Sequence, residues 1–201
     1  VQAISGGTAV VSVRQRLENL DLTWQAQYTF NGSNLLVSNQ VHVGADVPTL
    51  PRLGMRFVLD KAYESMRWYG RGPHESYWDR KSGAPLGIYS GTVSEQYVPY
   101  IMPQEFGNKT DVRWVTFRDG TGGGLRFRGA PLFEVSVKHY TDHELFAARH
   151  TIDLDAHEEI YVNIDWHQMG LGGASCGPMT LPQYQILPGE YTFTFVIETL
   201  Q

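Results

Sequence analysis

The sequence predicts an all-β protein, a large antiparallel β-sandwich of about twelve short strands. Apolar and polar residues alternate in many short segments, as they do in strands with one buried face. Turn-forming residues separate these segments, and no long segment has the period of an amphipathic helix. The composition agrees, because 21 glycines, 10 prolines, 11 tyrosines, 9 phenylalanines and 5 tryptophans among 201 residues favour strands and turns.

The first part of the chain predicts a meander of three strands, because residues alternate over Ala9–Leu17, Asp21–Phe30 and Leu35–Val43. The turn between the second and third segments contains Gly32, and glycine tolerates the positive φ of a tight hairpin. Further strands are predicted over Leu53–Leu59, Glu64–Tyr69, Leu86–Val93, Val112–Arg118, Leu125–Arg128, Leu132–His139, Thr151–Leu154, Glu159–Trp166 and Glu190–Thr199.

Two segments lack any regular period and predict ordered loops. Gly70–Arg80 is rich in polar side chains, and Tyr97–Gly107 is aromatic and rich in proline. A third segment, Tyr161–Pro182, begins as a buried strand and continues into glycines and prolines. Rigid sheets commonly present ligand-binding side chains on such loops. His143–His150 is long enough for about two turns of helix.

The length and the composition favour one domain over residues 1–201, because a chain of this length can bury a sizeable core. The formal charge of −5 comes from mixed charges without a long basic run, so we expect neither nucleic acid nor a membrane surface as the main partner. The apolar segments are too short to span a bilayer. One cysteine forbids an intrachain disulfide and leaves the redox compartment undecided.

The loop around Cys176 offers two candidate nucleophiles. Gly173-Ala-Ser175-Cys-Gly177 matches the serine nucleophile elbow by letter, but the elbow needs a following helix and a later histidine. Pro178 precludes that helix, and no histidine follows His167. Cys176 could instead act as a thiolate with His157 or His167 as its base, but no cation is adjacent in sequence. A neutral thiol that packs against a ligand is the favoured interpretation.

Three carboxylates in the irregular loops, Glu75, Asp79 and Glu105, are candidates for the acid pair of a glycosidase. The alternative interpretation is stronger: these carboxylates accept hydrogen bonds from the loop backbone or pair with Arg71, Arg80 and Arg113. The seven histidines show no recognisable ligand spacing, so we expect no metal site on this chain.

Five motifs in order resemble a known family. They are Gly70-Arg-Gly-Pro-His-Glu-Ser-Tyr-Trp-Asp-Arg80, Tyr97-Val-Pro-Tyr100 with Pro103-Gln-Glu-Phe-Gly-Asn108, Asp111-Val-Arg113-Trp114, Asn163-Ile-Asp165 and Met169-Gly-Leu-Gly-Gly173. From about Pro51 to its end, the chain resembles the C-terminal β domain of large bacterial β-galactosidases of glycoside hydrolase family 2. In some relatives this domain is a separate small subunit.

The resemblance implies an oversized antiparallel sandwich, the supersandwich shared with galactose mutarotases. The family's domain extends further at its N-terminal side, so we expect that Val1 lies inside it and that the chain is a truncated part of a larger enzyme. In that family both catalytic carboxylates and a magnesium ion lie on a TIM-barrel domain, on the same chain or a large subunit. The resemblance therefore implies no catalytic residue and no cofactor on this chain.

The resemblance gives Cys176 and Ser175 a role in binding the sugar. In one well-known relative, a tryptophan at the position that matches Cys176 forms an aromatic platform for the sugar beyond the cleaved bond. Other relatives have cysteine, as this chain does. A thiol offers less stacking area than an indole, so a different affinity for acceptor sugars is expected.

The implied function is that of a non-catalytic domain of a retaining β-galactosidase, an enzyme that hydrolyses terminal β-D-galactosides. The domain would lend a loop to the sugar pocket and dock against the barrel, in an enzyme that assembles as a homo-oligomer. Two alternatives stay open. One is a stand-alone carbohydrate-binding module, and the other is an aldose mutarotase, for which His74 and Glu75 are the adjacent histidine and carboxylate.

Overall fold

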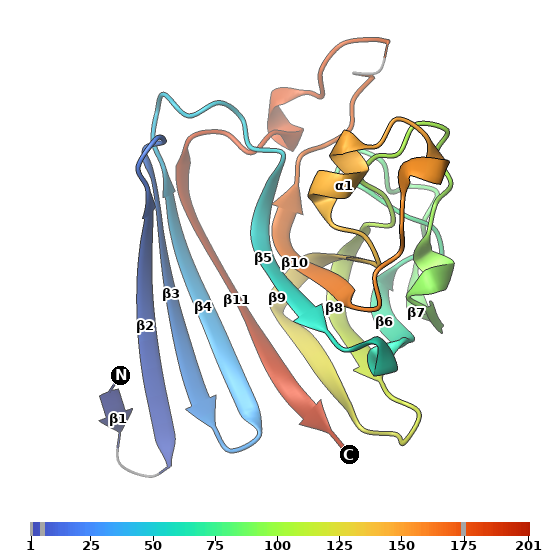
Figure 1. The fold of residues 1–201 in the computed structure, drawn as a ribbon. Helices are drawn as coiled ribbons and strands as arrows, with labels where there is room; N and C mark the ends of the chain where they lie inside the picture. Colours follow the sequence, from blue (N-terminus) through green and yellow to red (C-terminus); the bar gives the residue numbers. More distant parts are fainter. Residues whose placement is uncertain (1, 5–6, 174–175) are drawn as a thin grey trace.

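A computed structural model describes residues 7–173 and 176–201, together with the backbone of 2–4. Within these residues, eleven strands form one antiparallel hydrogen-bonded network (Figure 1). The strands are β1 (Gln2–Ile4), β2 (Thr8–Leu17), β3 (Leu22–Asn31), β4 (Asn34–Val43), β5 (Arg52–Leu59), β6 (Ser65–Arg71), β7 (Leu86–Thr92), β8 (Lys109–Arg118), β9 (Gly124–Lys138), β10 (Ile160–Gln168) and β11 (Gly189–Leu200).

The strand order is β1-β2-β3-β4-β11-β9-β8-β6-β7, and β10 branches from β9 and pairs with β5 on its other side. Strand β9 carries the branch. Its first half pairs with β11 as far as Ala130, and its second half pairs with β10 from Glu134 onward. Pro131 stands between the two halves and has no backbone N–H to donate to either partner. A single long strand therefore belongs to both layers of the sandwich.

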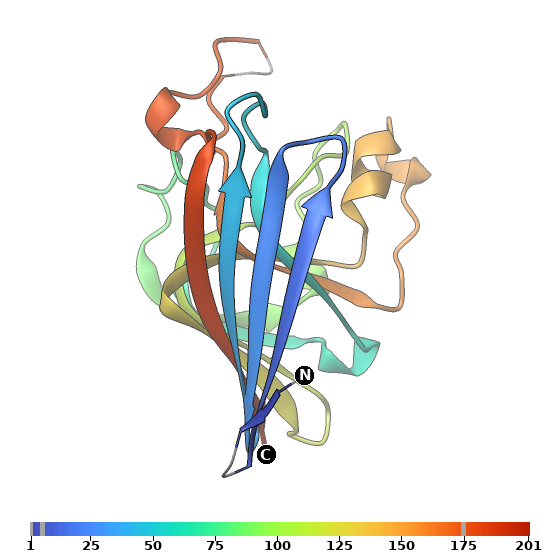
Figure 2. The ribbon, with the colours of Figure 1, turned by 90° about the vertical axis from the view of Figure 1, so that its left-hand side faces the viewer.

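The core lies between the β5–β10 pair and the layer that contains β4, β11 and β9. Phe57 of β5 packs its ring against Phe127 of β9 at a centroid distance of 5.2 Å and against Phe195 of β11 at 5.9 Å. Figure 2 shows β2, β3, β4 and β11 side by side on one face of the molecule. The eleven antiparallel strands and their two layers confirm the predicted all-β antiparallel sandwich.

Strand β4 shows why alternation predicted the strands. Val37, Asn39, Val41 and Val43 are buried, whereas the residues that alternate with them are polar and partly or fully exposed: Ser38, Gln40 and His42. Asn39 interrupts the apolar series, but its side chain accepts a hydrogen bond from the Trp24 indole at 3.0 Å. A buried amide with such a partner costs much less free energy than an unpaired one.

Helices are short. The α-helix α1 spans Asp142–Ala147, as the sequence suggested for this region, and the 3₁₀ helices are η1 (Lys61–Tyr63), η2 (Ser94–Gln96), η3 (Thr151–Asp153) and η4 (Pro182–Tyr184). The prediction of a strand over Thr151–Leu154 was wrong, because this segment forms η3. No helix in the described part of the chain has the length and hydropathy needed to cross a membrane.

Candidate functional site

The loop that follows β10 rises from the end of the sandwich near the start of β5, and η4 leads it back to β11 (Figure 1). Cys176 is exposed on this loop, and its backbone N–H donates to the Gly173 carbonyl at 3.0 Å. The Gly173 N–H donates in turn to the Pro178 carbonyl at 3.0 Å. Ser175, the other predicted sugar-binding residue, lies outside the described residues.

Asp79 holds both sides of the Cys176 loop. One carboxylate oxygen accepts from the Leu171 N–H at 2.9 Å, and the other accepts from the Gly172 N–H at 2.7 Å and the Thr180 hydroxyl at 2.9 Å. Gly172 has a φ of +56°, and a Cβ at this position would overlap the backbone of Thr180. Partial burial raises the pKa of Asp79, but the backbone hydrogen bonds outweigh it and lower the pKa below its usual value.

Glu75 lies in the same polar loop as Asp79, and its carboxylate is also held by several partners. Its carboxylate pairs with Arg80 at 2.6 Å, accepts from the Gly107 N–H at 2.9 Å and accepts from the Tyr100 hydroxyl. Burial raises the pKa of Glu75, but the bonds from Tyr100 and Gly107 hold it below its usual value. Within the described residues, no hydrogen bond joins His74 to Glu75, so the pair considered for a mutarotase does not converge.

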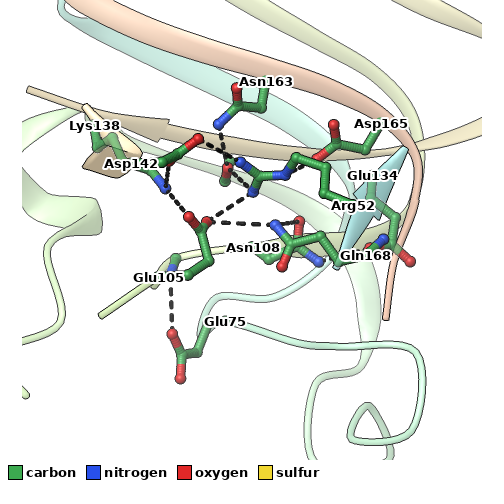
Figure 3. A network of polar contacts seen from close by, with 12 residues as sticks. Arg52, Glu75, Glu105, Asn108, Glu134, Lys138, Asp142, Asn163, Asp165 and Gln168 are labelled. Atoms are coloured by element: carbon green, nitrogen blue, oxygen red, sulfur yellow. Dashed lines mark hydrogen bonds and ion pairs between the residues drawn. The ribbon is translucent and has the colours of Figure 1, made fainter. Parts of the chain in front are cut away.

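Glu105, the third candidate acid, belongs to a network of charged side chains (Figure 3). Arg52 Nη2 lies 2.9 Å from Glu105 Oε1, and Arg52 Nη1 lies 3.0 Å from Asp142 Oδ2. Lys138, whose side chain is fully buried, bridges the same two carboxylates at 2.5 and 3.3 Å. Burial raises the pKa of Asp142, but Lys138 and Arg52 outweigh it and lower the pKa to about 2.

Asp165 of β10 is another member of this network with a fully buried side chain. Its Oδ2 lies 3.0 Å from Arg52 Nε, although the two groups are not aligned as a hydrogen bond. Neither oxygen of the Asp165 carboxylate has a hydrogen-bond partner among the described residues. Burial raises the pKa of Asp165 to about 7, and the charge of Arg52 offsets only part of this increase.

The two histidines considered as bases for Cys176 have other partners. His167 Nδ1 lies 2.8 Å from Glu134 Oε1, and its ring stacks on Trp78 at a centroid distance of 4.1 Å. His157 Nε2 lies 2.6 Å from Glu144 Oε1. Within the described residues, neither ring is hydrogen-bonded to Cys176, so the structure assembles no thiolate–imidazole pair.

A groove of about 690 Å³ lies beside the Cys176 loop. Its lining residues come from the start of β5, the polar loop between β6 and β7, the loop before β8, α1 and the end of β10: Pro51, Arg52, Tyr77, Met102, Pro103, Gln104, Glu105, Asp142, Leu145, Phe146, Gln168, Met169, Gly170 and Leu171. Three charged residues of the network, Arg52, Glu105 and Asp142, line it together with the apolar side chains of Met102 and Phe146. In the described residues, no group of three or more histidine, cysteine or acidic side chains could hold a metal ion.

Sequence reasoning found the loops but missed this network. Arg52, Lys138, Asp142 and Asp165 were not selected as site residues, because each looks like an ordinary charged residue at a strand end or in a turn. Lys138 and Asp165 carried a signal: both occupy inward positions near the ends of apolar strands, and buried charges occur almost always in pairs.

Comparisons with known proteins identify the family. The family model for the β-galactosidase small chain matches residues 2–197. The β-galactosidase of Priestia megaterium is 39% identical over 194 residues, which are 95% of this chain and 19% of that protein. The β-galactosidase of Vibrio cholerae is 31% identical over 189 residues, which are 94% of this chain and 18% of that protein. The chain thus spans about a fifth of the length of these relatives.

Solved structures resemble the fold at low sequence identity. An aldose epimerase homologue from C. elegans aligns with a TM-score of 0.50 and 12% identity over 99% of this chain and 67% of that chain. The galactosidase domain of the α-galactosidase–sucrose kinase AgaSK aligns with a TM-score of 0.51 and 6% identity over 96% of this chain and 24% of that chain. These likenesses concern the sandwich fold alone. By the match of residues 2–197 to the family model, the chain belongs to the β-galactosidase small-chain family.

Proposed function

We propose that this chain is the non-catalytic C-terminal β domain of a retaining β-galactosidase of glycoside hydrolase family 2, which hydrolyses terminal β-D-galactosides. Membership of the small-chain family and the names of the relatives support this proposal. The catalytic carboxylates and a magnesium ion belong to a TIM-barrel domain, on the same chain or a large subunit, and the complete enzyme is a homo-oligomer. The domain described above supplies a loop to the sugar pocket and a surface that docks on the barrel.

The state of the carboxylates supports the absence of a catalytic pair. A glycosidase needs one carboxyl group with a raised pKa as its general acid. The pKa values of Glu75 and Asp79 are lowered by their hydrogen bonds, so these groups stay ionised and cannot donate that proton near neutral pH. Asp165 has a raised pKa, but its side chain is fully buried and cannot reach a sugar.

The observation that carries the proposal is the exposed Cys176 on a loop held by Asp79. The loop projects beyond the sandwich, and its backbone groups near Cys176 are held in place by hydrogen bonds at both ends. Such a loop can present backbone donors and acceptors to sugar hydroxyls, while the thiol packs against the apolar face of a sugar ring. The TIM-barrel domain cleaves the glycosidic bond.

The proposal is tested by comparing the isolated chain with the complete enzyme on an aryl β-galactoside. We expect turnover by the complete enzyme and none by the isolated chain. Turnover by the isolated chain at an ordinary enzyme rate, about 1–10³ per second, would contradict the proposal. Calorimetry of the isolated chain with a galactoside tests the alternative of a carbohydrate-binding module, which saturable binding would favour. Polarimetry of α-galactose with the isolated chain tests the alternative of a mutarotase, which accelerated mutarotation would favour.

A further inference from the structure

The groove beside the Cys176 loop has an unusually exposed apolar wall. Phe146 of α1 is 90% exposed and Met102 is 63% exposed, and both line the groove. Ile101, adjacent to Met102, is 92% exposed. Large apolar side chains gathered at a concave surface commonly mark a site of contact with another protein surface. This groove with Ile101, Met102 and Phe146 is called the apolar groove below.

The charged side chains that line the apolar groove, Arg52, Glu105 and Asp142, already have partners of opposite charge within this chain. Arg52 forms ion pairs with both Glu105 and Asp142, and Lys138 pairs with the same two carboxylates. Arg56 adds a further ion pair to Asp142. Because these charges satisfy each other, the groove offers little attraction to a free ion. Its accessible binding energy comes from burying the apolar wall, so the occupant should present apolar side chains.

The position of the groove limits which partner can bind there. Gly170 and Leu171 line the apolar groove and also lead directly into the loop that carries Cys176. In Figure 1, α1 and this loop both lie in the upper part of the molecule, toward the same end. A catalytic domain that brings its sugar pocket to Cys176 must approach this end. The relatives also contain about four-fifths of their chain outside the matched region, which is ample to cover such a surface.

We propose that the apolar groove is the docking site for an apolar segment of the catalytic domain, with Phe146 at the centre of the contact. The proposal rests on the proposed function, because it takes the barrel as the partner that reaches Cys176. Docking at this groove fixes the Cys176 loop against the sugar pocket through Gly170 and Leu171. A buried aromatic side chain at the centre of an interface typically contributes a large share of its binding free energy.

The test is photo-cross-linking in the complete enzyme, with a benzophenone amino acid at position 146. Ile152 of η3 is the matched control, because it is 91% exposed and lies outside the groove lining. Mass spectrometry then identifies the cross-linked peptides for the Phe146→benzoylphenylalanine and Ile152→benzoylphenylalanine variants. We expect a cross-link from position 146 to the catalytic domain, in at least about tenfold higher yield than from position 152.

Three outcomes would overturn the docking proposal: a cross-link from position 146 to a second copy of this domain, no cross-link from it, or equal yields from positions 146 and 152. Galactoside hydrolysis is measured on the unsubstituted complete enzyme and on the Ile152→benzoylphenylalanine variant, and both should keep it. If the enzyme hydrolyses galactosides but position 146 does not cross-link to the catalytic domain, the docking site is wrong and the proposed function stands. If the enzyme has no such activity, the proposed function fails first.

Discussion

Oδ2 of Asp79 lies 2.7 Å from the backbone nitrogen of Gly172, a residue 93 positions later in the chain. Together with the bonds to Leu171 and Thr180, this contact ties the polar loop Gly70–Arg80 to the loop that carries Cys176. Asp79 was a candidate acid by sequence, and its geometry makes it a positioning residue. The three hydrogen bonds it accepts are charge-assisted and therefore stronger than neutral ones.

Replacing Asp79 should loosen the Cys176 loop. In the Asp79→Asn variant, the amide nitrogen cannot accept a hydrogen bond, so at least one of the three bonds is lost. A hydrogen bond to a charged group contributes about 1.5–3 kcal/mol, so the amide hydrogens of Leu171 and Gly172 should exchange about tenfold faster or more. Hydrogen–deuterium exchange measures this, with exposed Asp46→Asn as the control. Unchanged exchange at both amides would refute this role of Asp79.

The buried carboxyl of Asp165 should make the stability of the chain depend on pH. Burial raises its pKa in the folded state to about 7, above the usual value of 3.8. The folded state therefore binds the proton more tightly, and the stabilisation by this group is complete below about pH 4 and is lost as the pH rises to about 7. The Asp165→Asn variant lacks this dependence.

Urea unfolding at pH 5 and pH 8 tests this assignment. Between these two values, the wild-type chain should lose more stability than Asp165→Asn, because only the wild type must ionise a buried carboxyl. Replacement of Asp165 also changes the surroundings of Arg52, so the comparison is made within each protein across pH and not between proteins at one pH. An equal change in both proteins would show that another group is responsible.

Loss of the buried lysine should be severe. Lys138→Met leaves Glu105 and Asp142 without the fully buried ammonium group that lies between them. Breaking a buried ion pair by removing one partner typically costs about 3–5 kcal/mol of unfolding free energy. The exposed pair of Lys61 with Glu158 is the matched control, and Lys61→Met should change stability little, because water screens the attraction between two exposed charges. Similar effects of the two substitutions in chemical denaturation would argue against the network as a structural element.

The strands could be predicted because alternation is local. Val41 is apolar because it lies on the buried face of β4, and its sequence neighbours Gln40 and His42 are polar because they lie on the exposed face. The continuity of β9 could not be predicted, because Gly129-Ala130-Pro131 resembles a break between two strands. Only the pairing with β11 on one half and β10 on the other shows that this segment is one strand.

The site was predictable only in part, for a related reason. The motifs placed Asp79, Glu105 and Cys176 in loops, but loop partners depend on contacts between residues far apart in the chain. Arg52 meets Glu105 across 53 positions and Asp142 across 90, and no local pattern encodes such distances. The prediction of a strand over Thr151–Leu154 failed because a segment of four residues is too short to show a strand or helix period, and it forms η3 instead.

The central claim, that Cys176 faces the galactoside in the complete enzyme, is tested most directly by alkylation of this thiol. The rate of Cys176 modification by iodoacetamide is measured in the complete enzyme, by mass spectrometry, with and without a non-hydrolysable galactoside. At ten times its Kd, a ligand that covers the thiol should slow modification about tenfold, in proportion to the remaining free enzyme. Modification at the same rate with and without the galactoside would contradict the claim.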